Sequence, residues 1–162
     1  MAEPNYICNE LVPCSLRAWN NFAGYTKYKS RLPNHEDSLA YFLTLVPSNS
    51  STVTIPSHYF HIIVPWIEHI HCEALFIIKD SHIYVIKRSG NEWLALDYPH
   101  THVYMSIIDI SIQLQNVQYI VVLFPNIYNQ IFKVCVQLWN PKQIPYYMNF
   151  KRELLYTVSK YV

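Results

Sequence analysis

The stretch SHIYVIKRSGNEWLALD, Ser81–Asp97, decides the fold because two apolar-rich runs flank a turn at Gly90. Such a pattern predicts a β-hairpin. A histidine, His82, opens the first run, and a carboxylate, Asp97, closes the second. A turn centred just before Gly90 would place the two directly opposite, where Cβ atoms lie about 4.5–5.5 Å apart. We therefore expect the imidazole and the carboxylate to touch.

The sequence around this hairpin predicts helices first and an antiparallel sheet afterwards, which is an α+β arrangement. Apolar residues recur at helical spacing after Pro13, and Gly24 suits the end of that helix. The expected helices are 14–23, 35–46, 104–115 and 150–161, and the expected strands are 74–79, 82–88, 92–97 and 119–124. Segment 131–139 fits a strand or a buried helix, 47–52 reads as a loop, and 57–70 is ambiguous.

Composition favours one folded domain over residues 1–162. The chain has 51% hydrophobic and 14% charged residues, enough for a core. A net charge of +1 leaves no concentrated basic face for nucleic acid. The apolar runs are far shorter than the roughly 20 residues of a membrane span. Two glycines cannot build a phosphate-cradling loop, so we expect no nucleotide cofactor.

Four cysteines, Cys8, Cys14, Cys72 and Cys135, form no CxxC pair, and no secretory segment precedes them. This usage favours a reducing, intracellular setting, and we expect a cytoplasmic protein. Two glycines against fourteen tyrosines are typical of an AT-rich coding genome such as a viral one. For a viral protein the compartment would be the host cytoplasm.

Cys14 differs from the other cysteines because it opens a predicted helix. A helix N-terminus and a neighbouring imidazolium both favour a thiolate, the nucleophilic form of cysteine. The remaining cysteines are expected to be small buried hydrophobic residues. Cys14 as nucleophile, His82 as base and Asp97 as the group that orients it would form a catalytic triad.

The hairpin resembles the His/Asn hairpin of Josephin-domain deubiquitinases, a papain-like cysteine protease family. After His82 come a basic pair, Lys87–Arg88, a glycine turn, Trp93 and the closing Asp97. The helix of Cys14 carries the Asn-Asn pair of that family as Asn20–Asn21. The chain departs from the family at Ile83, where a tryptophan is usual, and at Asp97, where asparagine is usual.

This resemblance implies a single papain-like domain in which N-terminal helices pack on an antiparallel sheet. It implies a cysteine protease that cleaves peptide or isopeptide bonds after the C-terminus of ubiquitin or a ubiquitin-like protein. Asn9, five residues before Cys14, would take the place of the family's glutamine and support the oxyanion hole. No metal or other cofactor is implied.

The sequence also fits a second order of protease catalytic residues along the chain. Adenovirus-protease-like enzymes run histidine, acid, then a later cysteine preceded by glutamine, which here would be His82, Asp97, Gln130 and Cys135. Those enzymes have glycine after the nucleophile, whereas Val136 follows Cys135. A side chain there crowds the backbone N–H that faces the oxyanion.

The sequence also fits two interpretations that do not involve protease activity. The run HIHC would place His69 and His71 on one face of a strand beside Cys72, but zinc needs three or four ligands and no second cluster completes the set. We therefore expect no metal. The alternative without catalysis is an intracellular, viral accessory module that binds a host protein, for which fourteen tyrosines and four tryptophans would supply contact surface.

Overall fold

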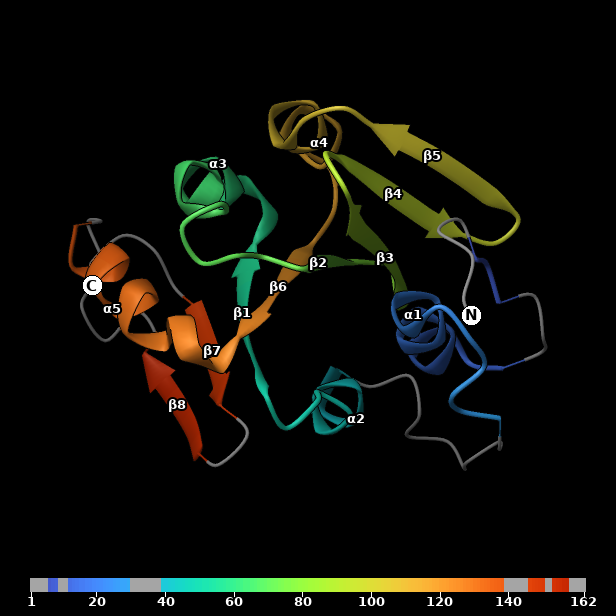
Figure 1. Cartoon of the computed structure of the whole chain (residues 1–162), viewed down its shortest axis with the longest axis horizontal. Helices are drawn as coiled ribbons and strands as arrows, with labels where there is room; N and C mark the ends of the chain where they lie inside the picture. Colours follow the sequence, from blue (N-terminus) through green and yellow to red (C-terminus); the bar gives the residue numbers. More distant parts are fainter. Residues whose placement is uncertain (1–5, 9–11, 30–38, 139–145, 151–152, 158–162) are drawn as a thin grey trace.

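The computed structural model describes residues 6–8, 12–29, 39–138, 146–150 and 153–157, with side chains as far as residue 134. These residues form an eight-stranded antiparallel sheet in the order β5-β4-β3-β2-β6-β1-β7-β8 (Figure 1). The strands are β1 Ser50–Pro56, β2 Ala74–Lys79, β3 His82–Ser89, β4 Glu92–Asp97, β5 His100–Tyr104, β6 Tyr119–Pro125, β7 Tyr146–Phe150 and β8 Glu153–Thr157. The chain is therefore a mixed α and β protein, as the sequence predicts.

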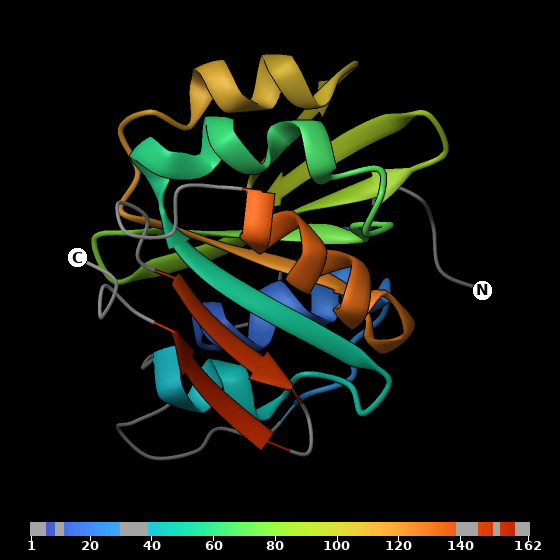
Figure 2. The same ribbon diagram turned by 90° about the vertical axis from the view of Figure 1, so that its left-hand side faces the viewer.

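Helices cover both faces of the sheet (Figures 1 and 2). The helices are α1 Cys14–Ala23, α2 Leu39–Thr44, α3 Phe60–Ile63, α4 Ile107–Gln113 and α5 Asn129–Leu138, with 3-10 turns η1 Ser57–Tyr59, η2 Val64–Trp66 and η3 Asn126–Tyr128. α1 and α2 lie on one face, and the other helices and η2 lie on the opposite face. Because helices cover both faces of the sheet, both sides of β2 and β6 are buried, and their sequences are continuous apolar runs. None of the described helices is long and apolar enough to cross a membrane.

An aromatic cluster fixes α1 and α2 on their face of the sheet. Trp19 of α1 lies 4.5 Å from the ring of Phe76 on β2 and 5.0 Å from that of Phe42 on α2, measured between ring centroids. The Trp19 indole Nε1 donates a hydrogen bond of 3.1 Å to the Phe42 carbonyl. Because all three side chains are almost fully buried, their packing holds α1 against β2 and β3.

The first predicted helix is confirmed at both ends. α1 begins at Cys14 directly after Pro13 and ends before Gly24, which has φ 84°. The Gly24 N–H donates to the Asn20 carbonyl at 2.9 Å, so a glycine in the left-handed region closes the helix. The start of α1 therefore places Cys14 at a helix N-terminus.

The predicted hairpin is present, but its register is two residues away from the expected one. β3 pairs with β4 through Ser89↔Glu92 and Val85↔Leu96, so the turn is Gly90–Asn91. His82 and Asp97 are consequently diagonal neighbours and do not lie directly opposite each other. Since a shift of two residues preserves the face of a strand, both side chains still project to the same side.

Three predictions of local structure were wrong. Residues 47–52 are not all loop, because β1 begins at Ser50; its Ser, Thr and Val residues are buried, and β-branched residues favour strands. No strand is predicted between 92–97 and 119–124, but His100–Tyr104 form β5. Of the predicted helix 150–161, the described residues 150 and 153–157 are strand, in β7 and β8, because β7 extends the ladder along the edge of β1. Residues 151–152 and 158–161 lie outside the described part.

The segments left open by the sequence are resolved by the structure. Residues 129–138 form α5 rather than a strand, and Phe132 of this helix is fully buried against Phe124. Residues 57–66 form the short turns η1, α3 and η2, and Pro65 lies within η2, where it has no helical N–H to lose. Of the predicted helix 35–46, the structure describes α2, and residues 35–38 lie outside the described part.

Candidate active site

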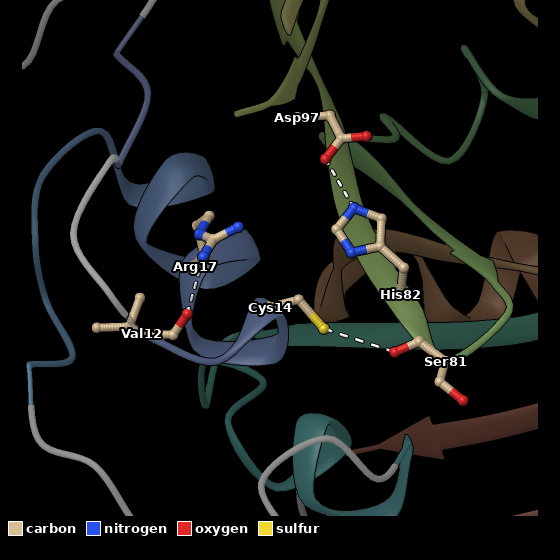
Figure 3. Close-up of polar contacts among 6 residues, drawn as sticks. All are labelled: Val12, Cys14, Arg17, Ser81, His82 and Asp97. Atoms are coloured by element: carbon tan, nitrogen blue, oxygen red, sulfur yellow. Dashed lines mark hydrogen bonds and ion pairs between the residues drawn. The ribbon is translucent and has the colours of Figure 1, made fainter. Parts of the chain in front are cut away.

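His82 and Asp97 form a hydrogen-bonded pair at the ends of neighbouring strands. The His82 Nε2–H donates to Asp97 Oδ1 at 2.7 Å (Figure 3). Diagonal cross-strand neighbours are within reach of long side chains, which explains the contact in the observed register. Because the carboxylate holds the proton on Nε2, the lone pair of a neutral imidazole lies on Nδ1. His82 therefore has one nitrogen oriented and the other available as a base.

A tight turn fixes His82 at the first position of β3. Lys79 pairs with His82, so Asp80 and Ser81 alone connect β2 and β3. Both have positive φ, 51° and 66°, as a type I′ hairpin turn requires. Neither residue is glycine, and a non-glycine residue in this region costs on the order of 1–3 kcal/mol. The packed strands on either side hold the turn in this conformation.

The β2–β3 turn also contacts the side chain of Cys14. The Cys14 Sγ lies 3.7 Å from the Ser81 carbonyl oxygen, to which the thiol donates a weak hydrogen bond. Ser81 directly precedes His82, so the thiol lies beside the start of β3. Figure 3 shows the His82 ring standing between the Asp97 carboxylate and the Cys14 side chain in that view. The structure thus brings Cys14, His82 and Asp97 to one end of the contact between α1 and β3.

The hydrogen bond from Cys14 to the Ser81 carbonyl involves the protonated thiol. A carbonyl oxygen accepts a hydrogen bond from S–H but not from a thiolate, so this partner favours the protonated form. Cys14 is half-buried and lies at the first residue of α1, and rotation about χ1 moves its sulfur between staggered positions. The observed side-chain rotamer therefore directs the Cys14 thiol to the Ser81 carbonyl.

Arg17 is a charged residue of this region that the sequence reasoning did not select. It lies three residues after Cys14, and residues at this spacing are neighbours on a helix surface. Its Nη2 donates to the Val12 carbonyl at 3.0 Å, and its buried Nε has no hydrogen-bond partner among the described residues (Figure 3). A cation near a thiol favours the thiolate. The signal available in the sequence was an arginine one turn after the helix-starting cysteine.

Asn20 and Asn21 have structural roles at this site. The Asn20 Oδ1 accepts hydrogen bonds from the backbone N–H groups of Lys27 (2.9 Å) and Tyr28 (2.7 Å). The Asn21 Oδ1 accepts one from the Cys8 backbone N–H. These amides fasten the segments before and after α1 to the helix. Asn9, next to Cys8, lies outside the described residues, so its oxyanion role stays a prediction.

Two other cysteines are unsuited to act as nucleophiles. Cys8 and Cys72 are each 1% exposed, which confirms the reading of both as buried hydrophobic residues. Burial raises the pKa of the Cys72 thiol to about 12, and its Sγ donates to the Ala74 carbonyl at 3.3 Å. Cys8, Cys14 and Cys72 are free thiols, and Cys14 is the most accessible of these three.

The alternative order through Cys135 is not favoured by the backbone. Cys135 lies on α5, which follows the Pro125 end of β6, whereas the other end of β6, Tyr119, pairs with Ile78 next to the β2–β3 turn. Seven strand residues at about 3.3 Å each separate these ends. α5 and α1 also lie on opposite faces of the sheet (Figure 2).

The HIHC segment is not a strand, so the zinc interpretation loses its geometry. His69 and His71 lie in a turn before β2 and are exposed, whereas Cys72 is buried. His69 packs on Trp66, and His71 stacks on Tyr128 with ring centroids 4.1 Å apart. Within the described part of the chain, no three His, Cys, Asp or Glu residues are placed to hold a metal ion.

Comparisons with known proteins identify no relative of this chain. No protein-family model, curated protein or solved structure matches the chain. The resemblance to Josephin domains therefore stays a prediction from the hairpin and from the helix of Cys14. The arrangement of Cys14, His82 and Asp97 is the observation from which a function can be argued.

Proposed function

We propose that this protein is a cysteine peptidase with a papain-like arrangement of Cys14, His82 and Asp97. The observation that carries the proposal is the 2.7 Å His82–Asp97 hydrogen bond at the end of the sheet where the Cys14 thiol lies against Ser81. A thiol at a helix N-terminus, a base beside it and a carboxylate that orients the base are the three parts of such a site.

In the proposed mechanism, His82 Nδ1 removes the proton from Cys14, and the thiolate attacks the carbonyl carbon of the scissile bond. The tetrahedral intermediate collapses when protonated His82 gives its proton to the leaving amine, which leaves a thioester on Cys14. Water, deprotonated by His82, then hydrolyses the thioester and restores the thiol. Asp97 accepts from Nε2–H throughout and so stabilises the imidazolium. The Cys14 backbone N–H and Asn9 would face the oxyanion.

By resemblance to Josephin domains, the proposed substrate is a bond after the C-terminus of ubiquitin or a ubiquitin-like protein. The partly exposed His82 and Asp97, with side chains 41% and 34% accessible, are compatible with a macromolecular substrate that approaches from outside. We propose the cytoplasm as the compartment, which for a viral protein is that of the host cell.

A fluorogenic ubiquitin C-terminal reporter tests this function. The wild-type chain should release the fluorophore, and Cys14→Ala should lose at least about 10³-fold of the rate, because the nucleophile is gone. Cys72→Ala is the matched control, since it removes a buried thiol remote from the turn and should retain activity. Activity that survives in Cys14→Ala but disappears in a folded Cys135→Ala chain would transfer the role to Cys135.

A second candidate is a protein-interaction module without catalysis, favoured by one surface. Met105, Ile108 and Ile112 are 65%, 61% and 58% exposed, and they lie on α4 or on its link to β5. Exposed apolar residues gathered in this way are typical of contact surfaces. Binding to a host protein that is unchanged by Cys14→Ala and is abolished by Ile108→Asp, in a chain with no hydrolytic activity, would favour this candidate.

A further inference from the structure

A cavity of about 720 Å³ lies at the other end of α1 and β3. Its lining includes Gly24 at the end of α1, Glu68 and Glu73 before β2, and Lys87 and Arg88 near the end of β3. α1 rises about 1.5 Å per residue, so its last residue, Ala23, is roughly 14 Å along the axis from Cys14. The cavity is therefore separate from the proposed catalytic site.

The two cations that line the cavity are already engaged. The Arg88 Nη2 donates to Glu68 Oε2 at 2.9 Å, and its Nε donates to the Cys72 carbonyl at 3.2 Å. The Arg88 guanidinium also lies over the ring of Trp93, 4.3 Å from its centroid. Lys87 Nζ donates to the Asn21 carbonyl at 2.9 Å, in the last turn of α1, where the helix dipole is negative.

Glu73 has neither an ion pair nor a side-chain hydrogen bond among the described residues, whereas Lys87 and Arg88 each donate at least one. Its backbone is bonded on both sides, by its own N–H to the Leu123 carbonyl and by its carbonyl to the Arg88 N–H. Its carboxylate is half-buried and forms no ion pair or side-chain hydrogen bond with any described residue. Burial raises the pKa of the Glu73 carboxyl above its ordinary value.

We infer that this cavity binds a basic side chain, a guanidinium or an ammonium group presented by a peptide, with Glu73 as its counter-ion. A cation that donates to Glu73 would supply the charge-assisted hydrogen bonds that the carboxylate lacks. An anion is disfavoured because Arg88 and Lys87 are already bonded to Glu68 and to the α1 carbonyl. A metal ion is disfavoured because the described residues offer no group of three ligands.

Binding of Nα-acetyl-arginine amide to the full chain tests this inference, with chemical-shift changes or calorimetry as the readout. The matched probe is Nα-acetyl-citrulline amide, which has the same shape but no positive charge. We expect the arginine probe to bind at least about tenfold more tightly than the citrulline probe, since hydrogen bonds to charged groups are worth about that much or more. Equal affinity for the two probes would overturn the inference, and this comparison requires no variant.

Glu73→Gln should reduce the affinity for the arginine probe about tenfold or more, whereas Asp109→Asn, a carboxylate on α4 outside the lining, should leave it unchanged. Inorganic phosphate that binds more tightly than the arginine probe would also overturn the inference. Cys14→Ala should bind the arginine probe like wild type. An inactive chain that still binds the probe would therefore refute only the proposed catalysis, and an active chain that binds neither probe would refute only this site.

Discussion

Both ends of β3 are two-residue hairpin turns, but they differ in which residues adopt positive φ. At the Gly90 end, a two-residue turn has its positive φ of 61° at a glycine, for which this conformation carries little strain. At the His82 end, Asp80 and Ser81 both adopt positive φ without glycine. The strained turn is the one whose carbonyl meets the Cys14 thiol and whose next residue is His82. The difference places the backbone strain of these two turns at the one that positions His82 beside Cys14.

The largest expected effect is at the His82 end. His82→Ala should lower kcat/KM for the ubiquitin reporter by about 10²–10⁴-fold, because the thiol loses its general base. The matched control is His100→Ala, which removes an exposed histidine from β5, where it pairs with Asp97 through the backbone. If the two variants lose activity equally, the assigned base is wrong.

Replacing the orienting group should have a smaller effect. Asp97→Asn should lower kcat/KM by less than about 10²-fold, because an amide oxygen can still accept a hydrogen bond from His82 Nε2–H. Asp97→Ala should cost more than Asp97→Asn, since the imidazole loses its only described side-chain hydrogen bond. The same reporter assay measures both, and an Asp97→Ala chain with full activity would contradict the orienting role.

At the cavity end of β3, the buried Cys72 thiol should make the stability of the fold depend on pH. Its folded pKa is raised by burial from 9.0 to about 12, so the stability contributed by the neutral thiol is present below pH 9.0 and is lost as the pH rises toward 12. One proton corresponds to at most about 1.4 kcal/mol per pH unit. Tyr84, with a pKa raised to about 12, acts in the same direction.

Denaturation at several alkaline pH values measures this effect. The unfolding free energy of Cys72→Ala should fall less steeply with pH than that of wild type. At about pH 8 the folded wild-type chain should not be alkylated at Cys72, because the buried thiol remains protonated. Alkylation of Cys72 at the rate of an exposed cysteine would contradict the burial of this thiol.

The smallest expected effects compare the two turns directly. Ser81→Gly should raise the unfolding free energy by up to about 1 kcal/mol, because relief of strain outweighs the added flexibility of the unfolded chain. Gly90→Ala should lower it by about 1 kcal/mol through backbone strain alone, since a Cβ at Gly90 would meet no atom within 4 Å. Urea denaturation of both variants measures this pair. Changes of the same sign would remove the distinction between the turns.

Much of the central sheet was predictable because its signals are local. The runs of β2, β3, β4 and β6 are apolar and bounded by turns, and α1 has proline and glycine at its ends. The pairing of His82 with Asp97 was predicted from the wrong register. The prediction succeeded because an error of two residues leaves both side chains on the same face, whereas an error of one would have separated them.

The remaining parts depended on tertiary contacts that the sequence does not display. β1 is rich in serine and threonine, and its burial follows from its position between β6 and β7. The apolar stripe of residues 150–161 suggested a helix, but the free edge of β1 recruits β7 and then β8 as strands. The positive φ of Ser81 had no signal, because neither Asp80 nor Ser81 is a glycine.

The central claim is tested most directly by locating the cysteine that a ubiquitin bearing a C-terminal electrophile modifies in the folded chain. Peptide mass spectrometry should find one adduct, on Cys14, which is absent from Cys14→Ala and strongly reduced in His82→Ala. An adduct on Cys135, or an intact folded chain that remains unmodified, would contradict the assignment of Cys14, His82 and Asp97 as one catalytic unit.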